Sequence, residues 1–280
     1  MKSPIFMFGS GRCGSTLLQR ALNAHPEVVM YGEHEGFLAP ISHSYYKLTE
    51  TRDIQRWVYG EQAIPAEALH GQISDMEADI CWVNNFTRDE VYQQHRQLVL
   101  SLLTKDLDLD QVHWGFKEIR YHKGQHVIWF LREMFPQPNF IFLFRNPAET
   151  IASGMTAWED PEKIMHDEDR FREDVWQRFL RWTSKYVYLL NHLEELGDKA
   201  YLLKYEDLVS DPETHMNHIF GMLGLDTPAK ALDMFQYRVA STQNHPHKAF
   251  LVERIQEFQR NCKHPEFRDV CARIGYEYRT

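Results

Sequence analysis

Apolar residues near the start of the chain occur first as a continuous run, then at helical spacing, then as a second run. Residues 4–8 form the first run and residues 28–30 the second, with Leu17, Leu18 and Leu22 between them. Buried strands of parallel sheets are almost continuously apolar, whereas an amphipathic helix repeats every three or four residues. The pattern therefore predicts a strand, a helix and a second strand, which is the start of a βαβ fold.

The same criteria predict the remaining elements. Residues 112–119, 139–145 and 200–208 have strand patterns, and the last of these runs into an acidic turn. Residues 88–103, 126–135, 167–196 and 211–224 have helical patterns, and the chain is again helical from Pro228 onward. Residues 139–145 are the most apolar strand, so we expect this strand at the centre of the sheet.

This alternation of strands and helices predicts an α/β fold, namely a single P-loop-like domain with a central parallel β-sheet flanked by α-helices. The chain has 280 residues, of which 43% are hydrophobic, so one domain spanning residues 1–280 can bury a large core. Within it we expect a helical insertion at about residues 42–111, which includes Trp57, Tyr59 and Trp82, and a helical C-terminal part at about residues 228–280. The aromatic residues of the insertion either shape a binding pocket or fill a small satellite core.

Composition narrows the class of protein. The formal net charge of −9 disfavours nucleic-acid binding, so any anion specificity has to come from a local group of cations. The four cysteines lack CxxC spacing, which indicates neither a disulfide framework nor a zinc site. Three residues precede the first strand and no apolar run is long enough to cross a bilayer, so we expect a cytoplasmic protein without a membrane span.

The turn after the first strand has the features of an anion-binding loop. Gly9, Gly11 and Gly14 allow close approach of the backbone, and the helix that follows adds its positive N-terminal end. Gly9 and Gly14 have the spacing of a nucleotide-binding P-loop, but Ser15 stands at the lysine position of that motif. Since Arg12 lies inside the loop instead, the sequence indicates a phosphate or sulfate ligand bound in a different geometry.

A second anion signal follows the central strand. Where a P-loop kinase would place a magnesium-binding aspartate, this strand ends in Arg145, which can bind a phosphate through two hydrogen bonds. Asn146 and Pro147 then open a helix that carries Ser153. His245 and His247 flank a proline without further ligand spacing, so we expect no metal site.

The loop residues Arg12-Cys13-Gly14-Ser15-Thr16, the run at residues 23–28 and the pair Gly32-Glu33 resemble the sulfotransferase superfamily, in particular its tyrosylprotein-type and bacterial branches. The spacing of Arg145 and Ser153 and the segment Tyr205-Glu206-Asp207-Leu208 share this resemblance.

The resemblance implies transfer of a sulfuryl group from 3′-phosphoadenosine 5′-phosphosulfate (PAPS) to a hydroxyl acceptor, or as a second choice an amine. It implies that Arg12 and the backbone from Gly11 through Cys13, Gly14 and Ser15 to Thr16 hold the 5′-phosphosulfate. Lys117 would then lie close to the sulfuryl group, and Glu33 would be the base. Arg145 and Ser153 would bind the 3′-phosphate.

Several alternatives stay open at this level. A P-loop nucleotide or small-molecule kinase is the rival enzyme class, and a non-catalytic nucleotide-binding protein on the same fold is the other. The acceptor can be a small metabolite, sugar, lipid or peptide, and the oligomeric state is undetermined. His34 and Glu35 compete with Glu33 as the base, and Ser241 or Lys248 can close over the nucleotide.

Overall fold

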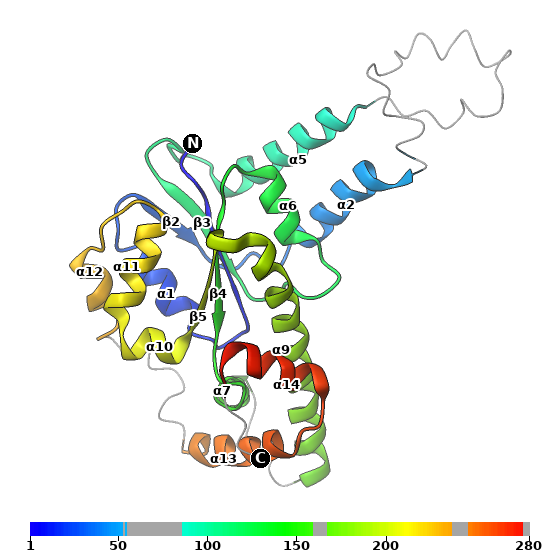
Figure 1. The fold of residues 1–280 in the computed structure, drawn as a ribbon, viewed down its shortest axis with the longest axis vertical. Helices are drawn as coiled ribbons and strands as arrows, with labels where there is room; N and C mark the ends of the chain where they lie inside the picture. The colour runs from blue at the N-terminus through cyan, green and yellow to red at the C-terminus, as the bar shows by residue number, and fades with distance from the viewer. Residues whose placement is uncertain (53, 55–85, 159–166, 237–245, 277–280) are drawn as a thin grey trace, which may run out of the picture. The chain divides into compact units, whose positions relative to one another are not determined.

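The computed structural model describes residues 1–52, 54, 86–158, 167–236 and 246–276 (Figure 1). Five strands alternate with helices along the chain. The strands are β1 (Ile5–Gly9), β2 (Val28–Tyr31), β3 (His113–Glu118), β4 (Asn139–Phe144) and β5 (Ala200–Lys204). The helices are α1 (Ser15–Leu22), α2 (Leu38–Glu50), α5 (Arg88–Leu103), α6 (Val127–Met134), α7 (Pro147–Trp158), α9 (Glu168–Leu196), α10 (Tyr205–Ser210), α11 (Pro212–Met222), α12 (Ala229–Asp233), α13 (Lys248–Asn261) and α14 (Pro265–Ile274).

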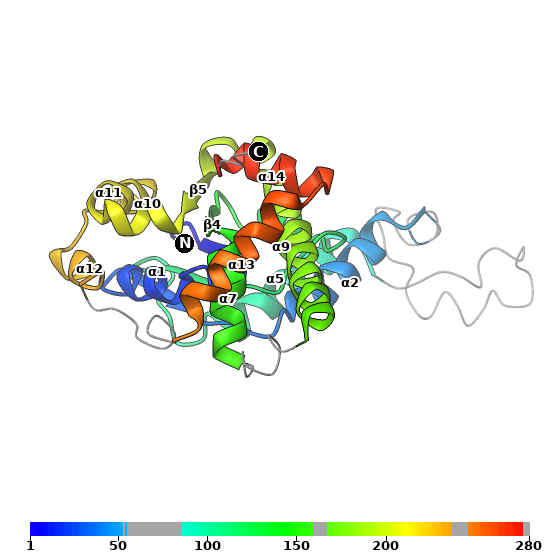
Figure 2. The same ribbon diagram turned by 90° about the horizontal axis from the view of Figure 1, so that it is seen from below.

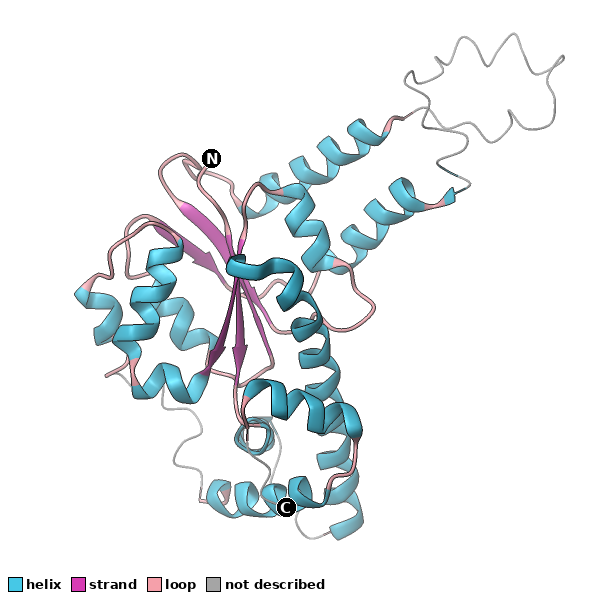
Figure 3. Ribbon diagram, viewed as in Figure 1, coloured by secondary structure: helices cyan, strands magenta, loops and turns pink. Residues whose placement is uncertain are grey.

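The five strands form one parallel sheet in the order β2-β3-β1-β4-β5 (Figure 3). Strand β1, rather than the expected residues 139–145, is the middle strand, with Ile5 beside Gly115 of β3 on one side and beside Asn139 of β4 on the other. Strand β4 lies next to it, between β1 and β5. Ligands of open parallel sheets bind beyond the carboxyl ends of the strands, where neighbouring connections diverge. In this sheet, the residues that follow β1, β3 and β4 meet at that edge.

The sheet buries side chains on both faces, which explains the continuous apolar runs. On one face, Ile5 and Met7 pack in a buried cluster with Leu18 of α1 and Phe220 of α11. On the other face, phenylalanines pack ring against ring, as Phe6 and Phe116 do at 4.9 Å between centroids. Helices α1, α10, α11 and α12 cover the first face, and α9 lies on the second (Figure 1).

Helix α13 connects distant parts of the sequence. It packs against α7, and the two helices lie side by side when the molecule is seen from below (Figure 2). This packing brings Lys248, the first residue of α13, next to Glu149 in the first turn of α7.

The described residues divide into two compact units. The first contains residues 1–36, 108–124 and 137–280 and holds the whole sheet, and the second contains residues 37–107 and 125–136. Helices α2, α5 and α6 of the second unit pack through Tyr45, whose hydroxyl donates to Glu133 and whose ring lies 5.6 Å from that of Phe130. Arg96 of α5 adds a 3.1 Å hydrogen bond to the Met134 carbonyl.

The predicted fold class is confirmed, and the expected strands are present with small differences at their ends. The acidic turn expected at the end of residues 200–208 is wrong, because Tyr205–Ser210 is a helix, α10. Pro212 then starts α11, where the Asp211 carboxylate accepts from Thr214 N at 3.1 Å. The organisation of residues 1–280 as one domain with an insertion stays a prediction, and Trp57, Tyr59, Trp82 and Ser241 lie outside the described residues.

Candidate functional site

The glycine-rich loop between β1 and α1 has a backbone that depends on Gly14. Gly14 is the N-cap of α1 and lies in the left-handed region, at φ 95° and ψ 8°. A Cβ atom at this position would lie 2.5 Å from Cε2 of Tyr205 and would overlap the ring. Tyr205 therefore packs directly over the start of α1, where the first N–H groups of the helix have no carbonyl partner within the helix.

The start of the loop is fixed by a buried tyrosine of α9. The Tyr186 hydroxyl accepts from Ser10 N at 3.2 Å, lies 2.8 Å from Ser10 Oγ and donates to the Leu143 carbonyl at 3.1 Å. Its ring stacks on Phe144 at 4.4 Å. These contacts tie the ends of β1 and β4 together, and burial raises the pKa of Tyr186 well above its usual value, so the hydroxyl stays protonated.

Two side chains of the loop face the interior of the protein. Cys13 is fully buried, and its Sγ would be 2.8 Å from a Cβ added at Gly9. Burial raises the pKa of the Cys13 thiol, partly offset by hydrogen bonds from the backbone and side chain of Ser15, which is also buried. Thr16 is exposed, so its hydroxyl faces outward at the same end of the helix.

Arg12, Arg145 and Ser153 form one connected group. Arg12 Nε donates to Ser153 Oγ at 3.2 Å, and Arg145 Nη1 donates to the Arg12 carbonyl at 2.9 Å. Arg12 has a positive φ of 67°, which turns the loop toward Arg145. Burial, and secondarily the positive charge of Arg145, lower the pKa of Arg12, so the two guanidinium groups repel each other across this site.

A carboxylate and a third cation complete this group. Glu149 lies 3.2 Å from Arg145 Nη2 and 3.2 Å from Lys248 Nζ. The Arg145 guanidinium lies 4.6 Å from the ring centre of Tyr205. Arg145 and Lys248 thus share one carboxylate, and Arg12 adds a third positive charge to the group. This excess of positive charge favours binding of an anion.

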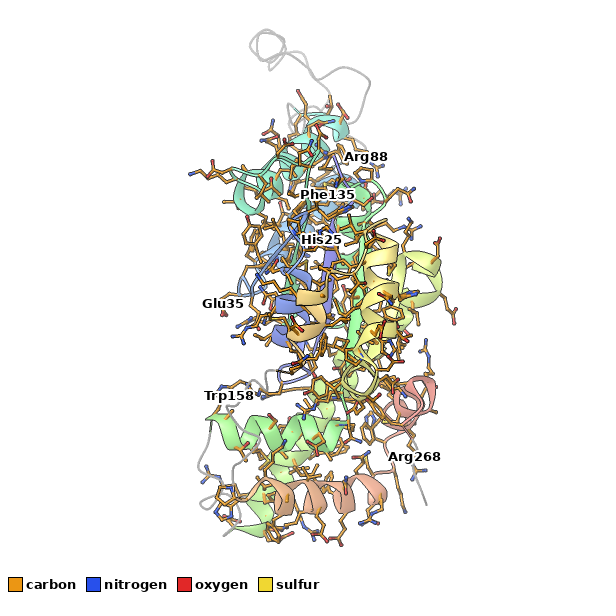
Figure 4. All side chains as sticks on the ribbon, turned by 90° about the vertical axis from the view of Figure 1, so that its left-hand side faces the viewer. His25, Glu35, Arg88, Phe135, Trp158 and Arg268 are labelled. Atoms are coloured by element: carbon orange, nitrogen blue, oxygen red, sulfur yellow. The ribbon has the colours of Figure 1, made fainter. Side chains whose placement is uncertain are left out.

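Glu33 lies in a second group of charges beyond the ends of β2 and β3. Lys117 Nζ donates to Glu33 Oε1 at 2.7 Å, and Arg120 Nη1 donates to Glu33 Oε2 at 2.8 Å. Lys117 is 6% exposed, whereas the side chain of Glu33 is 28% exposed, so the lysine is buried and the carboxylate can be reached from solvent. Glu35, the competing carboxylate, projects outward with its side chain 85% exposed (Figure 4).

The two groups flank the same loop. A Cβ atom at Gly11 would lie 3.5 Å from Cδ1 of Ile119, which follows Glu118 at the end of β3, and 3.7 Å from the Trp158 ring. Trp158 ends α7 with its side chain exposed (Figure 4), and the Arg12 guanidinium lies 5.8 Å from its ring centre. The structure therefore brings the sequence-predicted residues of both groups to one edge of the sheet.

Sequence reasoning missed several residues of the site. The sequence predicts no role in the site for Tyr186, Arg120, Glu118, Glu149, Trp158 or the ring of Tyr205. A charged pair at the end of a predicted strand, Glu118 and Arg120, was a visible signal, since Lys117 beside it was already a candidate. Tyr186 and Tyr205 carried no such signal, because helical aromatic residues are usually core residues.

In the part of the chain that the structure describes, no three His, Cys, Asp or Glu side chains gather in a way that could hold a metal ion. His247 is described and His245 is not. None of the described helices is both long enough and apolar enough to cross a membrane.

Comparison with known proteins adds a family and a fold. Residues 4–229 match the model of a family described as the sulfotransferase family. A sulfotransferase domain from the curacin biosynthetic pathway is 17% identical, with 99% of both chains covered and a TM-score of 0.55. A sulfotransferase from Alicyclobacillus acidocaldarius is 14% identical over 99% of this chain and 97% of that one, with a TM-score of 0.53.

The sulfotransferase domain of the olefin synthase of Synechococcus PCC 7002 is 19% identical over 99% of this chain and 97% of its own, with a TM-score of 0.52. No curated protein matches the chain.

Proposed function

The chain belongs to the sulfotransferase family, and we propose that it transfers a sulfuryl group from PAPS to an acceptor hydroxyl. The observation that supports this most directly is the meeting of Arg12, Arg145 and Ser153. These residues come from two motifs more than 130 positions apart, yet Arg12 hydrogen-bonds to Ser153 and Arg145 hydrogen-bonds to the Arg12 carbonyl. A donor with phosphates at both its 5′ and 3′ positions requires two neighbouring anion sites of this kind.

The residues proposed to bind PAPS leave a place for an external anion. Arg145 Nε is buried and has no hydrogen-bond partner among the described residues, and a buried donor without a partner is costly. Binding of the 3′-phosphate to Arg145 and Ser153 would satisfy it. The 5′-phosphosulfate would then bind to the backbone of residues 11–16 and to Arg12. Its negative charge would relieve the repulsion between Arg12 and Arg145.

In this proposal the transfer takes place beside Glu33, which follows β2, and Lys117, which lies near the carboxyl end of the neighbouring strand β3. When bound, PAPS supplies a sulfur that forms a bond to the acceptor oxygen while its bond to the 5′-phosphate oxygen breaks. Glu33 takes the proton of the acceptor hydroxyl, and Lys117 neutralises the charge left on the departing phosphate. Lys117 and Arg120 each donate to one oxygen of Glu33, and each oxygen keeps a second lone pair that can accept the proton.

The 3′-phosphate contact can be measured directly. Calorimetry should show that the wild-type protein binds 3′-phosphoadenosine 5′-phosphate more tightly than AMP. Arg145→Ala should weaken the first nucleotide about tenfold or more and leave AMP almost unchanged, since a hydrogen bond to a charged group contributes about 1.5–3 kcal/mol. Equal affinities in the wild type, or equal losses in the variant, would refute the assignment.

Arg254→Ala is the matched control for this experiment. Arg254 also packs on an aromatic ring, Phe171, at 4.1 Å and pairs with a carboxylate, Glu168. Its removal should leave both nucleotide affinities unchanged.

Transfer itself requires an acceptor. Isotope-labelled PAPS, offered with sugars, lipids, tyrosyl peptides and small hydroxyl metabolites, should yield a product heavier by one sulfuryl group in at least one class. Binding of the nucleotide without transfer to any class would favour a non-catalytic nucleotide-binding protein.

A further inference from the structure

Glu118, the last residue of β3, is a buried carboxylate with five N–H contacts. Its side chain has no exposed surface. Oε2 accepts from His34 N at 3.1 Å and from Gly36 N at 2.9 Å. Oε1 accepts from Ile119 N at 2.8 Å, from Arg120 N at 3.2 Å and from Arg120 Nη1 at 2.9 Å.

These contacts keep Glu118 charged inside the protein. Burial acts to raise the pKa of Glu118, but the hydrogen bonds from Arg120 and from the backbone of Gly36, His34 and Ile119 outweigh it and hold the pKa below its usual value. A buried charge is tolerated only when it is fully hydrogen-bonded. The carboxylate and the N–H groups around it therefore form one unit, and moving either part leaves charged or polar atoms without partners.

The segment that Glu118 holds is the one that carries Glu33. Glu35 has φ 57° and Gly36 has φ 70°, so two consecutive residues lie in the left-handed region. This conformation is unfavourable for Glu35, which has a side chain. The hydrogen bonds from His34 N and Gly36 N to Glu118 lie on both sides of Glu35 and stabilise this turn.

Glu118 also reaches the Glu33 side chain through Arg120. Arg120 Nη1 lies between the two carboxylates, 2.9 Å from Glu118 Oε1 and 2.8 Å from Glu33 Oε2. We propose that Glu118 is a positioning residue, which holds Glu33 in its reactive place through the backbone of residues 34–36 and through Arg120. The role of Glu33 in this proposal rests on the proposed function. The structural half of the proposal, that Glu118 holds residues 34–36 in place, does not.

Glu118→Gln tests this with almost no change in volume. Whichever oxygen becomes an amide nitrogen would face at least two N–H groups, so the segment should shift. We expect kcat at saturating acceptor to fall roughly 10- to 100-fold, as for a displaced catalytic group. The Kd of 3′-phosphoadenosine 5′-phosphate should change less than twofold, because Arg12, Arg145 and Ser153 do not contact Glu118.

A double-mutant cycle separates positioning from general damage. If Glu118 acts through Glu33, Glu118→Gln should have little further effect on kcat in a Glu33→Gln background. An unchanged kcat in the single variant, or losses that multiply in the double variant, would overturn the proposal. Glu168→Gln is the matched control, since Glu168 also pairs with an arginine, Arg172, but is exposed, and it should keep near-wild-type kcat.

Two further measurements cover a failure of folding or of the proposed function. If Glu118→Gln does not fold, Arg120→Gln replaces it in the test, because this variant keeps the buried carboxylate. Its loss in kcat should also be non-additive with that of Glu33→Gln. Additive losses would contradict the proposal. If the wild-type protein transfers no sulfuryl group, amide hydrogen exchange still reports on the turn. Faster exchange at His34 and Gly36 in either variant supports the structural half, and unchanged exchange overturns it.

Discussion

Gly14→Ala is expected to destabilise the protein and to weaken the proposed anion site. Gly14 has φ 95°, and a left-handed backbone costs a residue with a side chain about 1–2 kcal/mol. The new Cβ would also lie 2.5 Å from Cε2 of Tyr205, and overpacking of this kind costs about 1–3 kcal/mol. A less flexible unfolded chain offsets about 0.4–1 kcal/mol, so the net loss should be roughly 1.5–4 kcal/mol.

Thermal unfolding measures this loss. With an unfolding entropy of about 0.6 kcal/mol/K for a chain of this length, the melting temperature should fall by roughly 3–7 °C. The affinity for 3′-phosphoadenosine 5′-phosphate should fall as well, because the shift of Tyr205 or of the loop changes the place where Arg145 lies over the Tyr205 ring.

Gly124→Ala separates backbone strain from overlap. Gly124 has a similar φ of 90°, but an added Cβ would meet no atom within 4 Å. Gly124→Ala should therefore show the cost of backbone strain alone. When Tyr205→Ala is combined with Gly14→Ala, it should remove only the part of the stability loss that comes from overlap with the ring. Equal melting temperatures for Gly14→Ala and Gly124→Ala would refute the reasoning about Tyr205.

Three further predictions follow from the same site. EDTA should leave nucleotide binding and sulfuryl transfer unchanged, because Arg12, Lys117 and Arg145 provide the positive charge, and restoration of an EDTA-abolished activity by Mg²⁺ would favour a kinase-like enzyme. Glu33→Gln should slow turnover by about 10²-fold or more with an almost unchanged Kd for the sulfuryl donor, and the same loss of turnover in His34→Ala or Glu35→Gln instead would assign the base to that residue. Burial lowers the pKa of Lys185 to about 8. Above that pH the unfolded state binds more protons than the folded state, so the free energy of unfolding should rise with pH. From about pH 7 to about pH 10, the free energy of unfolding of the wild type, measured with urea, should rise by roughly 2–3 kcal/mol relative to that of Lys185→Met. A constant difference would contradict the lowered pKa of Lys185.

The α/β fold and the family could be read from the sequence because both depend on local patterns. Continuous apolar runs predict buried parallel strands, and the glycines of residues 9–14 predict a loop whose backbone a ligand can approach closely. Arg145 at the end of the most apolar strand predicts a second anion position in the same way, and this position stays a prediction. These signals lie within a few residues of one another, where backbone conformation and solvent exclusion act directly.

Contacts between distant residues were decided only by the tertiary structure. The order β2-β3-β1-β4-β5 places the ends of β1, β3 and β4 together, and no periodicity in the chain encodes that order. It brings Arg12 to Ser153 and Tyr205 over Gly14, and it turns Glu118 inward. A carboxylate at a strand end is normally solvated. Glu118 stays charged when buried because distant backbone N–H groups, those of residues 34 and 36, join the nearby donors of Ile119 and Arg120 in hydrogen-bonding to it.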